Sequence, residues 1–141
     1  MLPLSSAAGS DTVFHHLLRV YWEDTDAGGV VFYANYLKFF ERARTEWLRA
    51  LGLGQQALRD STGAIFVVTD TQVRYLWPAR LDDELRVSVD LKKRGSASLS
   101  IAQQAWCGQR LLAEGEIRIG CVDAHSFRPR RLPTEVSSLL P

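Results

Sequence analysis

One helical pattern followed by a long run of strand patterns limits this sequence to few architectures. Between residues 36 and 51, apolar side chains recur at steps of three and four, the spacing of one face of an α-helix. The stripe consists of Tyr36, Phe40, Ala43, Trp47 and Leu51, flanked by Leu37, Phe39, Leu48 and Ala50. Gly52 and Gly54 predict its end. We therefore expect one long helix with a wide apolar face.

After this helix the apolar residues alternate, as in half-buried strands. The alternation covers residues 65–75, 85–91, 99–101 and 111–121, and an earlier strand is expected at roughly residues 13–23. Short connections, such as residues 77–83 and 107–110, favour antiparallel pairing. One wide-faced helix among about five strands predicts an α+β domain, in which a curved antiparallel sheet wraps around the central helix. Uncovered sheet edges favour a dimer.

The length of 141 residues fits a single domain spanning residues 1–141. Residues 1–11 are expected to form a loose N-terminal arm, and residues 126–141, with three prolines, an irregular basic tail. The net charge of +1 gives no global field for nucleic acid. No apolar run is long enough to span a bilayer, and the N-terminal residues lack the basic region of a signal peptide. We expect a cytoplasmic protein with two reduced cysteines.

Acidic residues and glycines crowd into one short stretch before a run of aromatic residues: Glu23, Asp24, Asp26, Gly28 and Gly29. A calcium loop fits poorly, because the twelfth position counted from Asp24 is Asn35 and not a bidentate Glu. A turn or a helix cap would explain the glycines and one acid. No G-x-S-x-G elbow is present, and neighbouring His15 and His16 would point to opposite faces of a strand. Neither a metal nor a bound cofactor is predicted.

A carboxylate at a strand end, followed by glycines and a helix N-terminus, suits hydrolysis of an activated acyl group. Backbone N–H groups at a helix start can hold an oxyanion, and the carboxylate can attack the carbonyl or deprotonate a water. A thiol leaving group, with a free pKa of about 8.5, departs without a strong general acid, whereas the amine of an amide needs a proton. The arrangement therefore favours thioesters over peptides.

The stretch RVYWEDTDAGGVVFYANYLKFFERARTEWLR, with the later RYLWPARLDDEL, resembles the 4-hydroxybenzoyl-CoA thioesterase family of hotdog-fold proteins. Within that family it is most similar to the Tol–Pal-associated, YbgC-type acyl-CoA thioesterases. The likeness covers residues 19–133, and it implies active sites at a homodimer interface and, frequently, a homotetramer. It places the catalytic Asp at Asp26, and at Tyr33 the backbone N–H that polarises the thioester carbonyl. Gly28 and Gly29 fall in the substrate-binding part of this motif.

One position departs from many YbgC-type members, which carry His where this sequence has Tyr33. The founding benzoyl-CoA enzymes have Tyr there, so the departure bears on the choice between aromatic and aliphatic acyl groups.

Basic residues near two further places bind the phosphates of coenzyme A in the family. Lys93 and Arg94 fall in one of these places and Arg130 in the other, although a solvated strand end and tail would explain them equally well.

Arg44 lies within the apolar arc of the predicted helix, so it must be paired or meet another subunit. Glu41, three residues earlier, is the expected partner.

The sequence thus predicts an acyl-CoA thioesterase that acts through Asp26 and the Tyr33 N–H. Two alternatives stay open: a thioesterase for acyl carrier protein, and a hotdog module that binds acyl-CoA without cleaving it.

Overall fold

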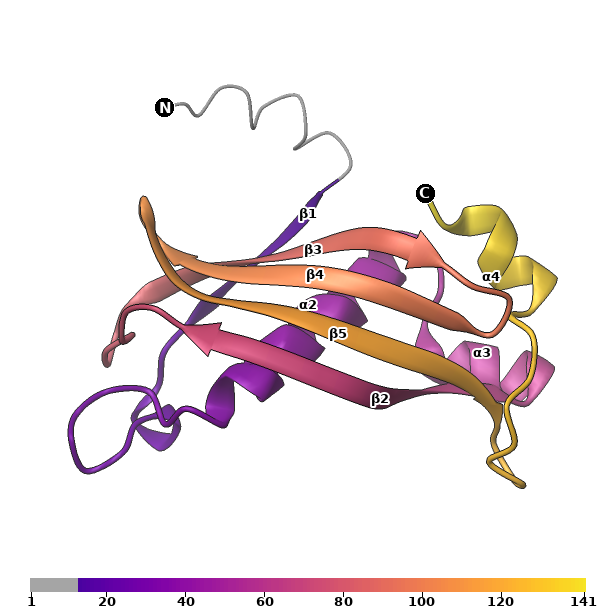
Figure 1. Ribbon diagram of the computed structural model, residues 1–141, viewed down its shortest axis with the longest axis horizontal. Coiled ribbons are helices and arrows are strands. Elements are labelled where there is room, and N and C mark those ends of the chain that lie inside the picture. Colours follow the sequence, from indigo (N-terminus) through magenta and orange to yellow (C-terminus); the bar gives the residue numbers. More distant parts are fainter. Residues whose placement is uncertain (1–12) are drawn as a thin grey trace.

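The computed structural model describes residues 13–141, so the expected N-terminal arm lies outside the described residues. Five antiparallel strands form one sheet in the order β1-β3-β4-β5-β2 (Figure 1). Their bounds are β1 Phe14–Arg19, β2 Ala64–Tyr75, β3 Glu84–Arg94, β4 Ser98–Cys107 and β5 Arg110–Asp123. The first strand is shorter than predicted, because the chain turns into a 3₁₀ helix, η1, at Trp22–Asp24.

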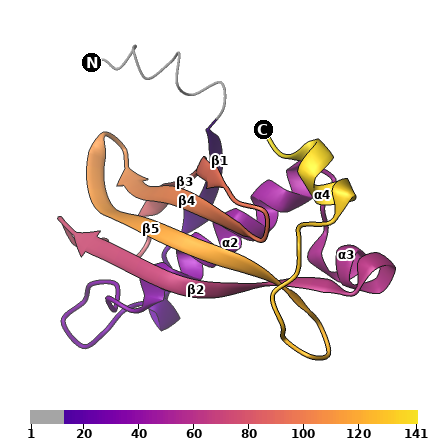
Figure 2. The ribbon, with the colours of Figure 1, turned by 45° about the vertical axis from the view of Figure 1, so that its right-hand side comes forward.

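Helix α2, Asn35–Ala50, is the predicted long helix, and it packs against β1 and β3 across one face of the sheet (Figures 1 and 2). Phe39, Phe40 and Ala43 on this helix are fully buried. Burial of a phenylalanine side chain contributes about 1.5–3 kcal/mol to folding. Leu37 and Ala50, expected on the same face, are exposed. The predicted antiparallel sheet with one long helix on it is confirmed.

The helix-facing residues of the strands complete the core. In β5, Ala113, Ile117 and Ile119 are buried and alternate with the more exposed Glu114, Glu116 and Arg118. This period of two is the signature of a sheet with one packed and one open face. Strands β1 and β2 are the two edges, and each pairs with one strand only.

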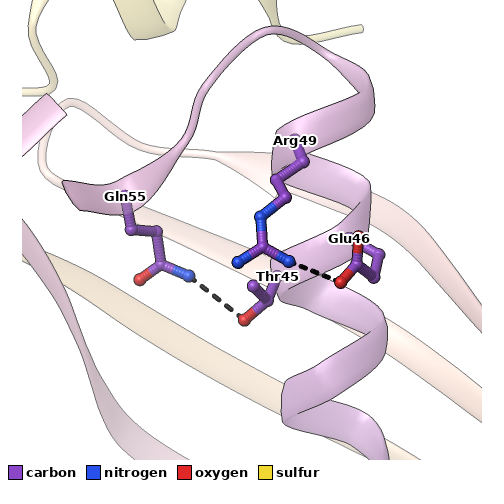
Figure 3. A network of polar contacts seen from close by, with 4 residues as sticks. All are labelled: Thr45, Glu46, Arg49 and Gln55. Carbon is purple, nitrogen blue, oxygen red and sulfur yellow. Dashed lines mark hydrogen bonds and ion pairs between the residues drawn. The ribbon is translucent and has the colours of Figure 1, made fainter. Parts of the chain in front are cut away.

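Two short helices were not predicted. Helix α3, Gln55–Thr62, follows α2 directly, and Gln55 donates a side-chain hydrogen bond to the Thr45 hydroxyl on α2 at 3.3 Å (Figure 3). On the same face of α2, Arg49 pairs with Glu46. Helix α4, Thr134–Leu139, lies in the tail that was expected to be irregular, and its Val136 is fully buried. The tail therefore closes the core at the end of the sheet that carries α3 (Figure 2).

A buried polar network replaces the expected ion pair of Arg44. The Arg44 side chain is 9% exposed, and its Nη1 donates to Oε1 of Gln103 on β4 at 2.8 Å. Gln103 in turn donates through Nε2 to the carbonyls of Phe40 (3.1 Å) and Ser88 (3.2 Å). Burial lowers the pKa of the Arg44 guanidinium, and the charge of Glu41 acts in the opposite direction. The predicted pair with Glu41 was wrong, because the Arg44 side chain is buried against Gln103 of β4 while Glu41 is exposed.

No helix among the described residues has the length and apolarity needed to cross a membrane. Within residues 13–141, no three His, Cys, Asp or Glu side chains gather into a metal site.

Candidate active site

The acidic stretch folds into a small hairpin that leads directly to the start of α2. Thr25 and Val31 form an antiparallel bridge, and the Asp26 N–H donates to the Val30 carbonyl at 2.8 Å. At the tip, the Gly29 N–H donates to the Asp26 carbonyl at 3.0 Å. Gly29 has φ +81°, a left-handed conformation that glycine adopts without steric cost. The loop lies at the end of the sheet opposite α3 and α4 (Figure 1).

Asp26 is exposed, and its carboxylate is held by Gly28, one of the two glycines predicted to bind substrate. The Gly28 N–H donates to Asp26 Oδ1 at 2.8 Å. A Cβ at Gly28 would lie 3.2 Å from the same oxygen, so this position favours glycine. None of the hydrogen bonds or ion pairs of residues 13–141 involves Oδ2 of Asp26. One carboxylate oxygen is therefore fixed by the turn, and the other is open to a ligand.

Asp24 occupies the opposite kind of environment. It is 4% exposed; its Oδ2 accepts the Tyr21 N–H at 2.8 Å, and its Oδ1 accepts the side-chain amide of Asn35 at 2.7 Å. Both oxygens are thus used to fasten η1 to the first residue of α2. Asp24 therefore caps the start of η1.

Tyr33 lies two residues before α2, directly after the returning arm of the hairpin. The Phe32 N–H donates to the Asp24 carbonyl at 3.0 Å, which keeps the two arms of the loop together. The Tyr33 N–H donates to no acceptor among the described residues. This N–H is therefore available as a donor beside the acidic loop. The Tyr33 ring is exposed.

Apolar and aromatic side chains surround this end of the molecule. Several are exposed: Tyr21, Trp22, Phe32, Tyr75, Leu76 and Trp77. The Val31 N–H donates to the Ala79 carbonyl at 2.9 Å, so the acidic loop and the β2–β3 connection are joined. The Tyr36 hydroxyl accepts the Ala79 N–H from the same connection at 3.2 Å. Neither Tyr75 nor the Tyr36 hydroxyl was predicted, because an apolar pattern does not indicate where a phenol group bonds.

The predicted basic residues lie at the other end of the sheet. Arg94 donates to the carbonyls of Leu140 (3.2 Å), Pro141 (3.4 Å) and Ser137 (3.1 Å), around helix α4. Arg130 donates to the Thr62 carbonyl at the end of α3, at 2.8 Å. Lys93 is exposed, and its side chain has no hydrogen bond or ion pair among the described residues. A single copy of the chain therefore does not bring these residues to Asp26.

Comparison with known proteins identifies the family. Residues 20–140 match the model of the thioesterase-like superfamily. The chain is 40% identical to the acyl-CoA thioesterase YbgC of Haemophilus influenzae over 128 residues, which is 91% of this chain and 94% of that protein. It is 44% identical to the acyl-CoA thioester hydrolase YbgC of Escherichia coli over 126 residues, or 89% and 93% of the two chains.

A solved structure of a similar protein has the same fold as this chain. A probable thioesterase from Bartonella henselae superposes with a TM-score of 0.83 at 31% identity, covering 86% of this chain and 99% of that one. The predicted class of enzyme, a thioester hydrolase, is confirmed by these relatives. The chain therefore belongs to the thioesterase-like superfamily and has its hotdog fold.

Proposed function

We propose that this protein hydrolyses acyl-CoA thioesters to a free acid and coenzyme A, with Asp26 and the Tyr33 N–H as its catalytic groups. The observation that carries the proposal is the pairing, in one loop, of an exposed carboxylate oxygen with an unpartnered backbone N–H at a helix start. The similarity to relatives named acyl-CoA thioesterase supports acyl-CoA as the substrate class.

In this mechanism the thioester carbonyl oxygen accepts the Tyr33 N–H, which stabilises the negative charge of the tetrahedral state. Asp26 then acts in one of two ways. Its Oδ2 attacks the carbonyl carbon, the C–S bond breaks, and water hydrolyses the resulting anhydride. Alternatively, the carboxylate takes a proton from a water that attacks the same carbon, and coenzyme A leaves as its thiolate. Neither route uses a metal or a resident cofactor.

The position of the basic residues supports a site completed by a second copy. Lys93 is the next-to-last residue of β3, whose end lies beside α4, and the acidic loop lies at the opposite end of the sheet (Figure 1). The Lys93 ammonium group can therefore meet a substrate bound at Asp26 only across a subunit contact. Strand β2 offers twelve residues at a sheet edge with one neighbour, which suits pairing with another chain. We therefore propose a homodimer, with further assembly to a homotetramer. The proposed substrate and two free cysteines suit the cytoplasm.

The test is a free-thiol release assay with a panel of acyl-CoA esters that differ in chain length and in aromatic character. Hydrolysis of at least one ester with saturation kinetics is the expected result. Two substrates with the same acyl group, one on coenzyme A and one on acyl carrier protein, distinguish an acyl-CoA thioesterase from an acyl carrier protein thioesterase. Tight binding of acyl-CoA without thiol release would contradict the proposal and favour a binding module.

A further inference from the structure

The last residue of β2 contacts the backbone of Tyr33, the residue that carries the proposed oxyanion donor, from outside the acidic loop. The Tyr75 hydroxyl donates to the Tyr33 carbonyl at 3.0 Å. The Tyr75 ring also meets the ring of Tyr33 edge-on, with centroids 6.1 Å apart, and the ring of Tyr36 at 5.4 Å. A residue of the sheet is therefore bonded to the segment immediately before α2.

This bond fixes the orientation of more than one backbone donor. The Tyr33 carbonyl and the Ala34 N–H belong to one planar trans peptide and point in opposite directions. When Tyr75 holds the carbonyl, the direction of the Ala34 N–H is set as well, and the rotation that would reorient the Tyr33 N–H is restricted. Neither N–H donates to an acceptor among the described residues. Two adjacent donors are thus left open beside the hairpin.

The Tyr75 phenol is suited to act as the donor to the Tyr33 carbonyl. Partial desolvation of the Tyr75 side chain raises its pKa, and the neighbouring Tyr33 adds to the effect, so the hydroxyl keeps its proton at neutral pH and acts as a donor. The alternative partner of the Tyr33 carbonyl is the Tyr36 N–H, at a longer 3.4 Å. A carbonyl that accepts a good hydrogen bond polarises its own peptide, which strengthens the Ala34 N–H as a donor.

We propose that Tyr75 is a positioning residue of the oxyanion site, which orients the Tyr33 and Ala34 N–H groups through its hydrogen bond to the Tyr33 carbonyl. This inference rests on the proposed thioesterase function. It predicts an effect on the chemical step and not on substrate affinity, because Tyr75 acts through the backbone.

The experiment compares Tyr75→Phe with Tyr21→Phe. Tyr21 is an exposed tyrosine near the same loop whose hydroxyl has no partner among residues 13–141. Tyr75→Phe keeps the ring contacts and should lower kcat about 3- to 10-fold with KM and the thermal midpoint unchanged, since one hydrogen bond is lost. Tyr21→Phe should match the wild type. Unchanged kcat in Tyr75→Phe, or an effect on KM alone, would overturn the inference.

A measurement independent of turnover uses the backbone amides of ¹⁵N-labelled protein. Loss of the bond to the Tyr33 carbonyl should shift the Ala34 amide resonance in Tyr75→Phe and leave it in place in Tyr21→Phe. An unshifted Ala34 resonance, or a kcat loss explained by a lower thermal midpoint, would also contradict the inference. Absence of hydrolysis by the wild-type protein would instead overturn the proposed function and this inference with it.

Discussion

The buried carboxylate of Asp24 accepts the side-chain amide of Asn35 at 2.7 Å, and this bond ties the acidic loop to the first turn of α2. The second Asp24 oxygen accepts the Tyr21 N–H. Two acids separated by one residue thus have different surroundings, since Asp24 is enclosed and Asp26 is open. The environment, more than the sequence motif, assigns Asp24 to the scaffold of the loop.

Asp24→Ala should reduce the free energy of unfolding, because it leaves two donors in a buried place without an acceptor. The expected loss is about 1–3 kcal/mol. Urea denaturation followed by circular dichroism measures it. A variant as stable as the wild type would show that water satisfies both donors and that Asp24 does not hold the loop.

Gly28→Ala should impair catalysis with little loss of stability, because the added Cβ would lie 3.2 Å from Asp26 Oδ1 and displace the carboxylate. A roughly tenfold lower kcat is expected for a displacement of this kind. Gly54→Ala is the matched control, since nothing lies within 4 Å of a Cβ at that position. Equal kcat values for the two variants would remove Gly28 from the support of Asp26.

Tyr33→Pro should remove the proposed oxyanion donor, together with the ring that meets Tyr75, without breaking a hydrogen bond of the Tyr33 N–H, which has no acceptor among the described residues. A loss of roughly 10²–10³ in kcat is expected for one such donor. Tyr33→Phe should keep most of the activity, since the backbone is unchanged. An inactive Phe variant would place the chemistry on the phenol hydroxyl, and a Pro variant as active as the wild type would contradict the role of the N–H. Circular dichroism verifies that both variants are folded.

Arg94 and Lys93 are neighbouring cations. Replacing each by Ala should show that Arg94 supports the fold and that Lys93 binds phosphate. Arg94 donates to three carbonyls around α4, so its loss should lower stability by about 1 kcal/mol and leave KM unchanged. Lys93 has a free ammonium group, so its loss should raise KM for acyl-CoA but not for a thioester that lacks the nucleotide. The Lys93 effect should shrink at high salt. The opposite assignment of the two effects would contradict this division.

The long helix and the strands were predictable because each repeats its apolar period over many residues. Helix α3 was missed because Leu58 is its single buried side chain, and α4 because Val136 is its only one. Local spacing suggested Glu41 for Arg44, whereas the observed partner is Gln103, a residue 59 positions away on β4. Contacts of this kind depend on tertiary structure, as do the bonds of Arg94 and Arg130 to helix-end carbonyls.

The candidate site was predictable in so far as one continuous stretch contains it. Asp26, the glycine pair and Tyr33 lie within eight residues, so their proximity follows from the hairpin. Tyr75 lies 42 positions from Tyr33 and reaches it only because β2 ends beside the loop.

The most direct test of the account is thioester hydrolysis by Asp26→Asn and Asp24→Asn, measured side by side on the best acyl-CoA substrate. Both changes remove a charge and keep the shape, and an Asn at position 26 can still accept the Gly28 N–H. At position 24, rotation of the Asn35 amide preserves both hydrogen bonds. We expect Asp26→Asn to be folded and inactive and Asp24→Asn to keep most of the wild-type kcat. An active Asp26→Asn variant beside an inactive, folded Asp24→Asn variant would contradict the assignment of Asp26 as the catalytic acid.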